Sequence, residues 1–193
     1  AAAEDLELHQ LDIKTAFLHG ELEETIYMEQ PTGYEEGPAG AACRLNKSLY
    51  GLKQAPRAWY TRLNKELETF GFVPSLADPS LFTLESKTST VYLLIYVDDI
   101  LIAGKDKDKV NYIKEELLTR FEGRDLGEVT SFLGINITRE RNNNMIKIDQ
   151  AGMISSILQQ FGLEEAKTKT IPLSPTVKLS KNEGEPLDKK RFP

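Results

Sequence analysis

The sequence predicts an α+β fold in which helices cover one face of an antiparallel sheet. Its strand-like and helical segments follow one another without the regular alternation that is typical of a parallel sheet. Residues 91–104 (VYLLIYVDDILIAG) place two apolar arms on either side of Asp98 and Asp99, which is the pattern of a β-hairpin with a tight turn. Residues 56–70 begin with a proline, carry large apolar residues at helical spacing and precede a glycine, so they are predicted to form a helix.

The chain before that helix is predicted to hold one strand, a short helix and loops. Residues 6–13 alternate between apolar and polar side chains, as a half-buried strand does, and Asp12 falls near the end of this strand. An acid at that place is ordinarily a helix cap or a turn residue, and a short helix is expected from Thr15. Residues 33–40 are dense in glycine, proline and charge, which is typical of a loop. In the segment KSLYGLKQA, Gly51 suits either the close approach of a ligand or an ordinary turn.

The second half of the chain mixes hairpins and helices in the same way. Leu81–Glu85 is a predicted strand that pairs with the first arm of residues 91–104, and Asp106 or Asp108 is expected to cap the helix that follows. Further on, Gly134 indicates a bulge or the close approach of another backbone inside a strand. The remaining predicted elements are a hairpin of residues 129–137 and 145–148, a helix of residues 149–161, and a linker or unfinished element in residues 173–193.

Charge is segregated along the chain, although the net charge is only −6. That net charge alone argues against nucleic acid as a partner. Residues 4–36, however, contain ten acids and one base, whereas residues 37–65 contain six bases and no acid. The basic segment is the footprint expected where a polyanion or a triphosphate binds, although a solvated basic surface is the slightly favoured explanation when charge is considered alone.

Composition excludes several classes of site. Cys43 is the single cysteine, so no internal disulfide can form. His9 and His19 are the two histidines, and neither has the spacing of a zinc ligand. No apolar run approaches the roughly 20 residues that cross a bilayer, and no signal peptide is expected.

The adjacent carboxylates of Asp98 and Asp99 are the strongest candidate for chemistry. Solvation of a turn explains most Asp-Asp pairs, because aspartate is a common turn residue. In an antiparallel sheet, however, Asp12 at the end of one strand can lie beside the turn of a neighbouring strand. Three carboxylates there would hold two magnesium ions roughly 3.5 to 4 Å apart, an arrangement that activates an attacking hydroxyl and stabilises a leaving phosphate.

Five segments occur in an order that carries a family resemblance. They read LDIKTAFLHGEL, KSLYGLKQAPRAWY, LLIYVDDILIAG, RFEGRDLGEVTSFLGINI and QAGMISSILQQFGL. In this order they resemble the reverse transcriptase of Ty1/copia-type LTR retrotransposons, over residues 6–179. The resemblance implies the palm of a right-hand polymerase with partial fingers in residues 1–148, and the start of the thumb or connection in residues 149–193. It also implies an RNA-directed DNA polymerase that extends a primer on an RNA or DNA template by two-metal nucleotidyl transfer.

The resemblance further implies roles for individual residues. Asp12, Asp98 and Asp99 would be the catalytic residues and the ligands of two Mg²⁺ ions, with Mn²⁺ as an alternative. The residues expected to bind the nucleotide are Thr15, Ala16, Phe17, Tyr50, Gly51 and Gln54. Those expected to contact nucleic acid are Lys53, Arg57, Tyr96, Leu133 and Gly134. Phe17 takes the place of the bulky residue beneath the incoming sugar, whereas Tyr50 departs from the glutamine that retroviral relatives often carry.

The expected partners are a template with its primer, deoxynucleoside triphosphates, and the rest of the Pol polyprotein with its fingers, RNase H and integrase. No membrane partner is expected, and the resemblance implies an intracellular location, in a cytoplasmic virus-like particle or in the nucleus. Because most of the fingers would fall outside residues 1–193, the chain alone is expected to be inactive. Two alternatives stay open. One is a catalytically inactive remnant or domesticated module that binds nucleic acid or a partner through residues 44–65. The other, less favoured, is a magnesium-dependent nuclease, for which no water-activating base is evident.

Overall fold

The structure, a computed structural model, describes residues 1–87 and 89–171. The chain divides into two compact units, Ala1–Gln150 and Ala151–Pro193. The linker or unfinished element expected in residues 173–193 lies outside the described residues. No helix in the described part of the chain is long and apolar enough to cross a membrane.

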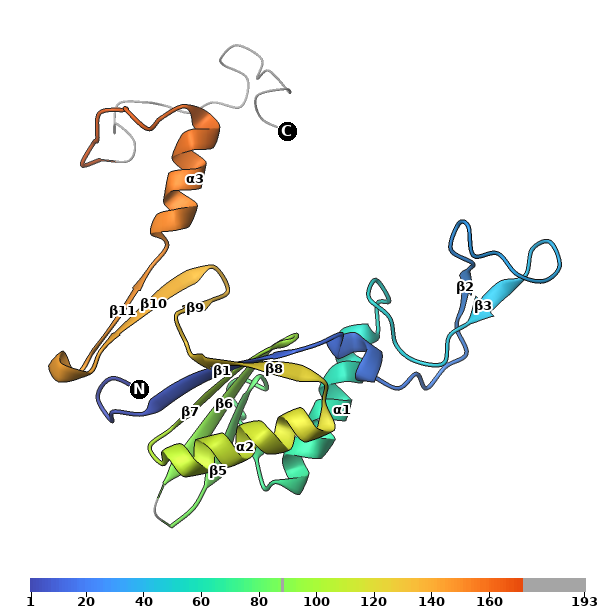
Figure 1. The fold of residues 1–193 in the computed structure, drawn as a ribbon, viewed down its shortest axis with the longest axis horizontal. Coiled ribbons are helices and arrows are strands. Elements are labelled where there is room, and N and C mark those ends of the chain that lie inside the picture. The colour runs from blue at the N-terminus through green and yellow to red at the C-terminus, as the bar shows by residue number, and fades with distance from the viewer. Residues whose placement is uncertain (88, 172–193) are drawn as a thin grey trace. The chain divides into compact units, whose positions relative to one another are not determined.

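A six-stranded antiparallel sheet forms the centre of the first unit (Figure 1). In spatial order its strands are β4 (Val73–Pro74), β5 (Leu81–Glu85), β6 (Thr90–Tyr96), β7 (Asp99–Gly104), β1 (Glu7–Ile13) and β8 (Gly123–Glu128). Every pair of neighbours is antiparallel, as the sequence predicts. The first strand of the chain therefore lies between two strands that come much later, and it receives hydrogen bonds from both.

Helices cover one face of this sheet. The 3₁₀ helix η1 (Ala16–His19) and the helices α1 (Ala55–Thr69) and α2 (Lys107–Arg120) all contribute buried residues to one hydrophobic core. Alternate residues of the central strands, such as Leu11 and Ile100, are fully buried in the same core. The residues between them face away from the helices, because successive side chains of a strand point to opposite faces. The expected placement of the helices on one face is confirmed.

The starts of the two long helices follow local signals in the sequence. Pro56 lies in the first turn of α1, where its missing amide hydrogen costs nothing. Asp106 caps α2, because its carboxylate accepts a hydrogen bond from the Lys109 amide at 3.1 Å. The structure thus decides between the two caps that the sequence allows.

An ion-pair cluster joins α1 to α2. Glu66 of α1 accepts hydrogen bonds from Arg62 and from Arg120 of α2, and 15% of the Glu66 side chain is exposed. These hydrogen bonds hold the pKa of Glu66 below its usual value. The two guanidinium groups also lie over aromatic rings, Arg62 over Phe121 and Arg120 over Phe70. The cluster therefore helps to fix how the two helices pack side by side.

A second, three-stranded sheet follows the six-stranded one in the chain. Its strands are β9 (Ser131–Phe132), β10 (Ile135–Glu140) and β11 (Met145–Asp149), with the 3₁₀ helix η2 (Arg141–Asn143) between the last two. The prediction of one strand over residues 129–137 with a bulge or close backbone approach at Gly134 is wrong. Leu133 and Gly134 adopt left-handed φ values of 50° and 77°, and they form a tight turn that joins β9 to β10.

A two-stranded sheet flanks the loop predicted at residues 33–40. It consists of β2 (Tyr27–Glu29) and β3 (Ala42–Arg44), which pair in antiparallel fashion. The sequence did not predict these strands, because three residues are too few to show an alternating pattern.

The second unit contains α3 (Ala151–Phe161), which confirms the helix predicted at residues 149–161. Met153, Ile154 and Ile157 of this helix are 56%, 56% and 43% exposed. The helix therefore presents apolar side chains at its surface.

Candidate functional site

The turn between β6 and β7 consists of Val97 and Asp98. Val97 has a φ of 57°, in the left-handed region that β-branched residues avoid, and this sign at the first turn residue alone is typical of a type II′ hairpin. Two hydrogen bonds hold the turn in place. The indole Nε1 of Trp59 donates to the Val97 carbonyl at 2.6 Å, and the Ile13 amide donates to the Asp98 carbonyl at 2.8 Å. The turn is therefore fixed by α1 on one side and by the end of β1 on the other.

The three predicted catalytic aspartates lie at the same end of the sheet. Asp12 of β1 and Asp99 of β7 are direct partners across the antiparallel ladder, and Asp98 is the adjacent turn residue. Directly paired residues place their Cβ atoms on the same face, roughly 4.5–5.5 Å apart. That face is the one away from the helices, because Ile13 and Ile100 beside these acids are fully buried in the core. The sheet thus carries two half-buried carboxylates side by side on its open face.

Each of the two carboxylates, Asp12 and Asp99, is contacted by a different neighbouring side chain. Gln10, two residues before Asp12 on the same strand, donates from Nε2 to Asp99 Oδ1 at 2.9 Å. Arg124 of β8 lies with Nε 3.7 Å from Asp12 Oδ2. Within residues 1–87 and 89–171, no three His, Cys, Asp or Glu side chains gather in an arrangement that could hold a metal ion. The carboxylates are neighbours, but in this structure their oxygens point to Gln10 and Arg124 and do not converge on a common point.

The donor set nevertheless fits a hard divalent cation. Asp12, Asp98 and Asp99 offer carboxylate oxygens, which are the ligands that Mg²⁺ prefers in proteins. The 3.7 Å contact with Arg124 is not a buried one, since Arg124 is 68% exposed at its side chain, and the hydrogen bond from Gln10 is only partly buried.

Five of the six residues expected at the nucleotide form two adjacent groups. Thr15 has left-handed dihedral angles (φ 50°, ψ 44°) and precedes η1, in which Ala16 is fully buried. The ring of Phe17 packs partly against the core and lies 4.5 Å from the ring of Tyr50, measured between centroids. Tyr50 is 47% exposed, and Gly51 beside it has a φ of 94° that only glycine adopts readily. The structure thus brings the first and second blocks of the resemblance into contact, through this aromatic pair, through the rings of His19 and Trp59, and through a hydrogen bond from the Ser48 amide to the Gly20 carbonyl.

The sixth residue, Gln54, faces a cleft of about 500 Å³ beside α1. Its Nε2 donates to the Glu24 carboxylate at 2.8 Å. The cleft is lined by Glu21, Glu23, Glu24, Gln54, Arg57, Ala58, Thr61, Arg62, Lys65 and Glu66. Three of the six bases in residues 37–65, Arg57, Arg62 and Lys65, therefore share this surface with four acids, so positive and negative side chains are mixed there. That mixing weakens the case for a simple polyanion-binding face at α1.

The residues expected to contact nucleic acid lie in three places. Lys53 and Arg57 are exposed at the start of α1. Tyr96, 56% exposed, is the cross-strand partner of Asp99 and so shares the open face with the aspartates. Leu133, 45% exposed, and Gly134 form the β9–β10 turn of the three-stranded sheet. Of these, Tyr96 is the residue that the ladder places directly beside the acidic site.

Three residues of the site were missed from the sequence. Gln10 could have been found, because it lies two positions before Asp12 and a strand repeats its face every second residue. Arg124 could not, since its place opposite Asp12 depends on an irregularity in the β1–β8 register between Gln10 and Leu11. Trp59, one of the large apolar residues at helical spacing in residues 56–70, is 2% exposed in the core, and its hydrogen bond to the Val97 carbonyl gives it a second role at the β6–β7 turn.

A family profile and several known proteins match most of this chain. A profile of the family described as reverse transcriptase (RNA-dependent DNA polymerase) matches residues 1–175. The retrovirus-related Pol polyprotein from transposon TNT 1-94 of Nicotiana tabacum is 45% identical over 183 residues, which are 94% of this chain and 14% of that protein. The corresponding polyprotein from transposon RE1 of Arabidopsis thaliana is 42% identical over 181 residues, 93% of this chain and 12% of that protein. A putative transposon Ty5-1 protein of Saccharomyces cerevisiae is 34% identical over 136 residues, 70% of this chain and 44% of that protein. The chain thus spans a small part of the length of the two Pol polyproteins.

Proposed function

The chain belongs to the reverse transcriptase family of copia-type retrotransposon Pol polyproteins, and on this basis we propose that it carries the polymerase active site of an RNA-directed DNA polymerase. Residues 1–148 would be the palm with part of the fingers, and residues 149–193 the start of the thumb. The substrates would be a primer on an RNA or DNA template and deoxynucleoside triphosphates. The rest of the Pol polyprotein would be the natural partner of this segment.

One observation carries the proposal. Asp12 and Asp99 are direct partners on the open face of the sheet, and Asp98 occupies the fixed turn next to them. Family members generally use divalent metals, and the donor set of these three residues suits Mg²⁺, with Mn²⁺ as the alternative. When bound, such ions supply activation of the attacking primer hydroxyl and stabilisation of charge on the phosphates.

Three neighbouring residues would orient the aspartates, reduce their mutual repulsion and fix the backbone of the turn before a cation binds. Gln10 orients the Asp99 carboxylate through its amide and can release it without leaving a buried charge behind. Arg124 partly neutralises Asp12, which lowers the repulsion between adjacent acids while no cation is bound. Trp59 holds the turn, so the backbone of Asp98 does not need to reorganise when substrate arrives.

The nucleotide would bind beside this acidic end. The amides of Thr15 and Ala16 would approach the triphosphate, and the Phe17 ring, held against the core and Tyr50, would lie beneath the sugar. Gly51 and Gln54 would lie over the new base pair. Lys53 and Arg57 would contact the backbone phosphates, while Tyr96, Leu133 and Gly134 would contact the primer.

The test replaces Asp98 by asparagine in a Pol polypeptide that contains this chain. Asp98→Asn should abolish primer extension and change primer-template affinity little, because phosphate contacts by basic residues do not depend on the lost charge. Asp108→Asn is a matched control, since Asp108 is exposed in the first turn of α2. Full extension by Asp98→Asn would refute the assignment of this turn to the catalytic site.

The non-catalytic binding module is not proposed further. It relied on a basic surface in residues 44–65, and the cleft at α1 brings four glutamates next to three of the six bases of this segment, namely Arg57, Arg62 and Lys65. The mixed charge weakens this alternative and does not affect the proposed polymerase site, which would lie on the open face of the sheet.

A further inference from the structure

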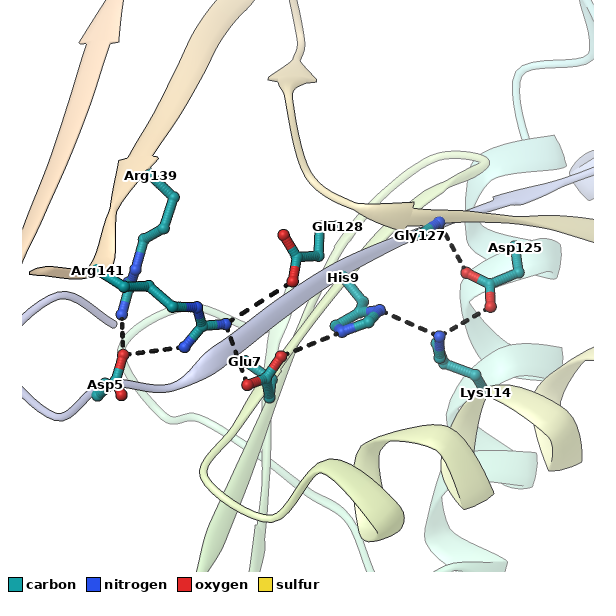
Figure 2. Close-up of polar contacts among 9 residues, drawn as sticks. All are labelled: Asp5, Glu7, His9, Lys114, Asp125, Gly127, Glu128, Arg139 and Arg141. Carbon is teal, nitrogen blue, oxygen red and sulfur yellow. Dashed lines mark hydrogen bonds and ion pairs between the residues drawn. The ribbon is translucent and has the colours of Figure 1, made fainter.

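Two arginines connect the three-stranded sheet to the N-terminal turn of the chain. Arg139 of β10 donates from Nη2 to Asp5 Oδ1 at 2.6 Å, and Arg141 of η2 donates from Nη1 to the same oxygen at 2.9 Å. Arg141 Nη2 also lies 3.0 Å from Glu7 Oε1 and 3.9 Å from Glu128 Oε1 (Figure 2). Two guanidinium groups therefore face three carboxylates, and the residues involved come from both ends of the first unit.

These contacts matter because the three-stranded sheet has little else to hold it. Among the described elements, β10 makes substantial contact with β9 and β11 but not with any strand of the six-stranded sheet. Met145 and Ile148 of β11 are 41% and 67% exposed, so this hairpin is not buried against an apolar surface. At the junction, the Val129 amide donates to the Leu8 carbonyl at 3.0 Å. Val129 and Phe132, which are 7% and 9% exposed, bury apolar side chains at the start of this sheet, whereas the orientation of its β10–β11 hairpin depends on the junction and on the ion pairs.

A row of neighbouring polar groups continues into the core, in which His9 Nε2 makes no hydrogen bond. Glu7 Oε2 lies 3.6 Å from His9 Nε2, His9 Nδ1 lies 3.1 Å from Lys114 Nζ, and Lys114 donates to Asp125 at 2.7 Å (Figure 2). His9 and Lys114 are each 6% exposed. The outer ion pairs are thereby linked to groups that α2 and β8 hold rigidly.

The backbone conformation and the charge of Asp5 both suit this contact. Its φ of 48° places it in the left-handed region, which aspartate tolerates better than most residues. The hydrogen bond from Arg139, helped by Arg141, holds the pKa of Asp5 below its usual value, so the carboxylate stays charged in mild acid. Asparagine is the natural replacement for a test, because it keeps the shape and tolerates the same backbone while it removes the charge.

We propose that Asp5, Arg139 and Arg141 are positioning residues for the polymerase. They hold the three-stranded sheet, and with it the Leu133–Gly134 turn, at a set place relative to β1, the strand that carries Asp12. The inference rests on the proposed function, in which that turn contacts the primer and Asp12 serves the chemistry. Because the contact consists of partly exposed charges, salt weakens it, and primer placement becomes dependent on ionic strength.

The structural half of the proposal is tested by hydrogen exchange of the chain at the Val129 amide, which reports opening of the junction. Asp5→Asn and Arg141→Gln should each raise exchange by about two- to fivefold, the range expected when partly exposed ion pairs are lost. Matched controls are Glu4→Gln, which removes an exposed charge next to Asp5, and Lys147→Gln, on the same hairpin as Arg141. The double variant should show less than the product of the two effects, because both changes remove the same contact. In about 1 M salt the parent and the variants should converge.

The functional half is tested by primer extension with a Pol polypeptide that contains the chain. Asp5→Asn and Arg141→Gln should raise the KM for primer-template severalfold with a small change in kcat, and the parent should acquire the same defect as salt is raised. Raised exchange with an unchanged KM would overturn the positioning role, and unchanged exchange would overturn the contact itself. A parent protein that extends no primer would overturn the proposed function, and the exchange measurement would separate this failure from failure of the contact.

Discussion

Replacing Lys114 by methionine tests whether a charge inside α2 stabilises the fold. Lys114 is 6% exposed on the face of α2 that packs against the sheet, and its Nζ lies 2.7 Å from Asp125 Oδ2 and 3.1 Å from His9 Nδ1. Methionine keeps the length and the apolar stem of the side chain but removes the charge and the donors. The change therefore isolates the polar contacts from the packing.

The expected loss is about 2 kcal/mol. A hydrogen bond to a charged group contributes about 1.5–3 kcal/mol, and the lower half of that range applies because the Asp125 side chain is 40% exposed and can be rehydrated. His9, with 8% of its side chain exposed, cannot regain water in the same way and adds to the loss. For a unit of this size, 2 kcal/mol corresponds to a fall in Tm of roughly 4–8 °C.

Urea unfolding followed by tryptophan fluorescence provides the assay. Trp59 is the single tryptophan and is buried in the core of the first unit, so its signal reports the unit that contains Lys114. Lys107→Met, at an exposed position in the same helix, is the control. A loss below about 0.5 kcal/mol for Lys114→Met, no larger than an ordinary surface change, would refute the reasoning.

The same variant should alter the acid limb of the stability curve. Burial alone would raise the pKa of Asp125, but hydrogen bonds from Lys114 and from the Gly127 amide outweigh it and leave the pKa below its usual value of 3.8. A group whose pKa is lowered on folding stabilises the protein above its unfolded pKa, and that contribution is lost as the pH falls through the folded value. Lys114→Met should therefore lose less stability than the parent between about pH 4 and pH 2.

Three further predictions concern the site and the helices. Gly123→Ala should lower the unfolding free energy by about 1–3 kcal/mol and slow primer extension, because the new Cβ would lie 2.7 Å from the Asp12 carbonyl oxygen. Urea unfolding measures the first effect and extension rates the second. An unfolding free energy and an extension rate equal to those of the parent would contradict the prediction. Glu66→Gln should make the unfolding free energy fall less steeply as the pH is lowered. The folded-state pKa of Glu66 is below its ordinary value of 4.5, so the carboxylate stabilises the fold above pH 4.5, and that contribution is lost as the pH falls through the folded-state pKa. An unchanged dependence of the unfolding free energy on pH would contradict the prediction. Phe17→Val should raise ribonucleotide incorporation relative to deoxyribonucleotide about tenfold, measured on one template, if the ring excludes the 2′-hydroxyl by collision. An unaltered ratio would mean that Phe17 is only a core residue.

The parts of the fold that the sequence predicted are those specified by local signals. The proline in the first turn of α1, the aspartate cap of α2 and the two apolar arms around Asp98 each act within a few residues. The break at Leu133–Gly134 was missed because a leucine gives no sign that it will adopt a left-handed φ. The burial of Lys114 was missed because lysine on a helix is ordinarily solvated, and the acid that pairs with it comes from β8.

The site shows the same division between local pattern and long-range pairing. That Asp12 could lie beside the Asp98–Asp99 turn followed from an antiparallel sheet, and the structure places Asp12 opposite Asp99. What each carboxylate contacts did not follow, because Arg124 reaches Asp12 only through the register of β8. Side-chain partners between distant strands depend on register, and one irregularity changes every partner beyond it.

Val97 shows why the turn that carries Asp98 is rigid. A valine in the left-handed region costs about 1–3 kcal/mol, whereas a glycine there would cost little but would leave the turn free to move. The hydrogen bonds from Trp59 and Ile13 to the two turn carbonyls offset that cost and select one conformation. Adjacent carboxylates repel each other, so on a mobile turn they would separate until a cation arrived. If the proposed function holds, a fixed turn would retain this repulsion in the folded state, and binding of a divalent cation would relieve it and so gain affinity.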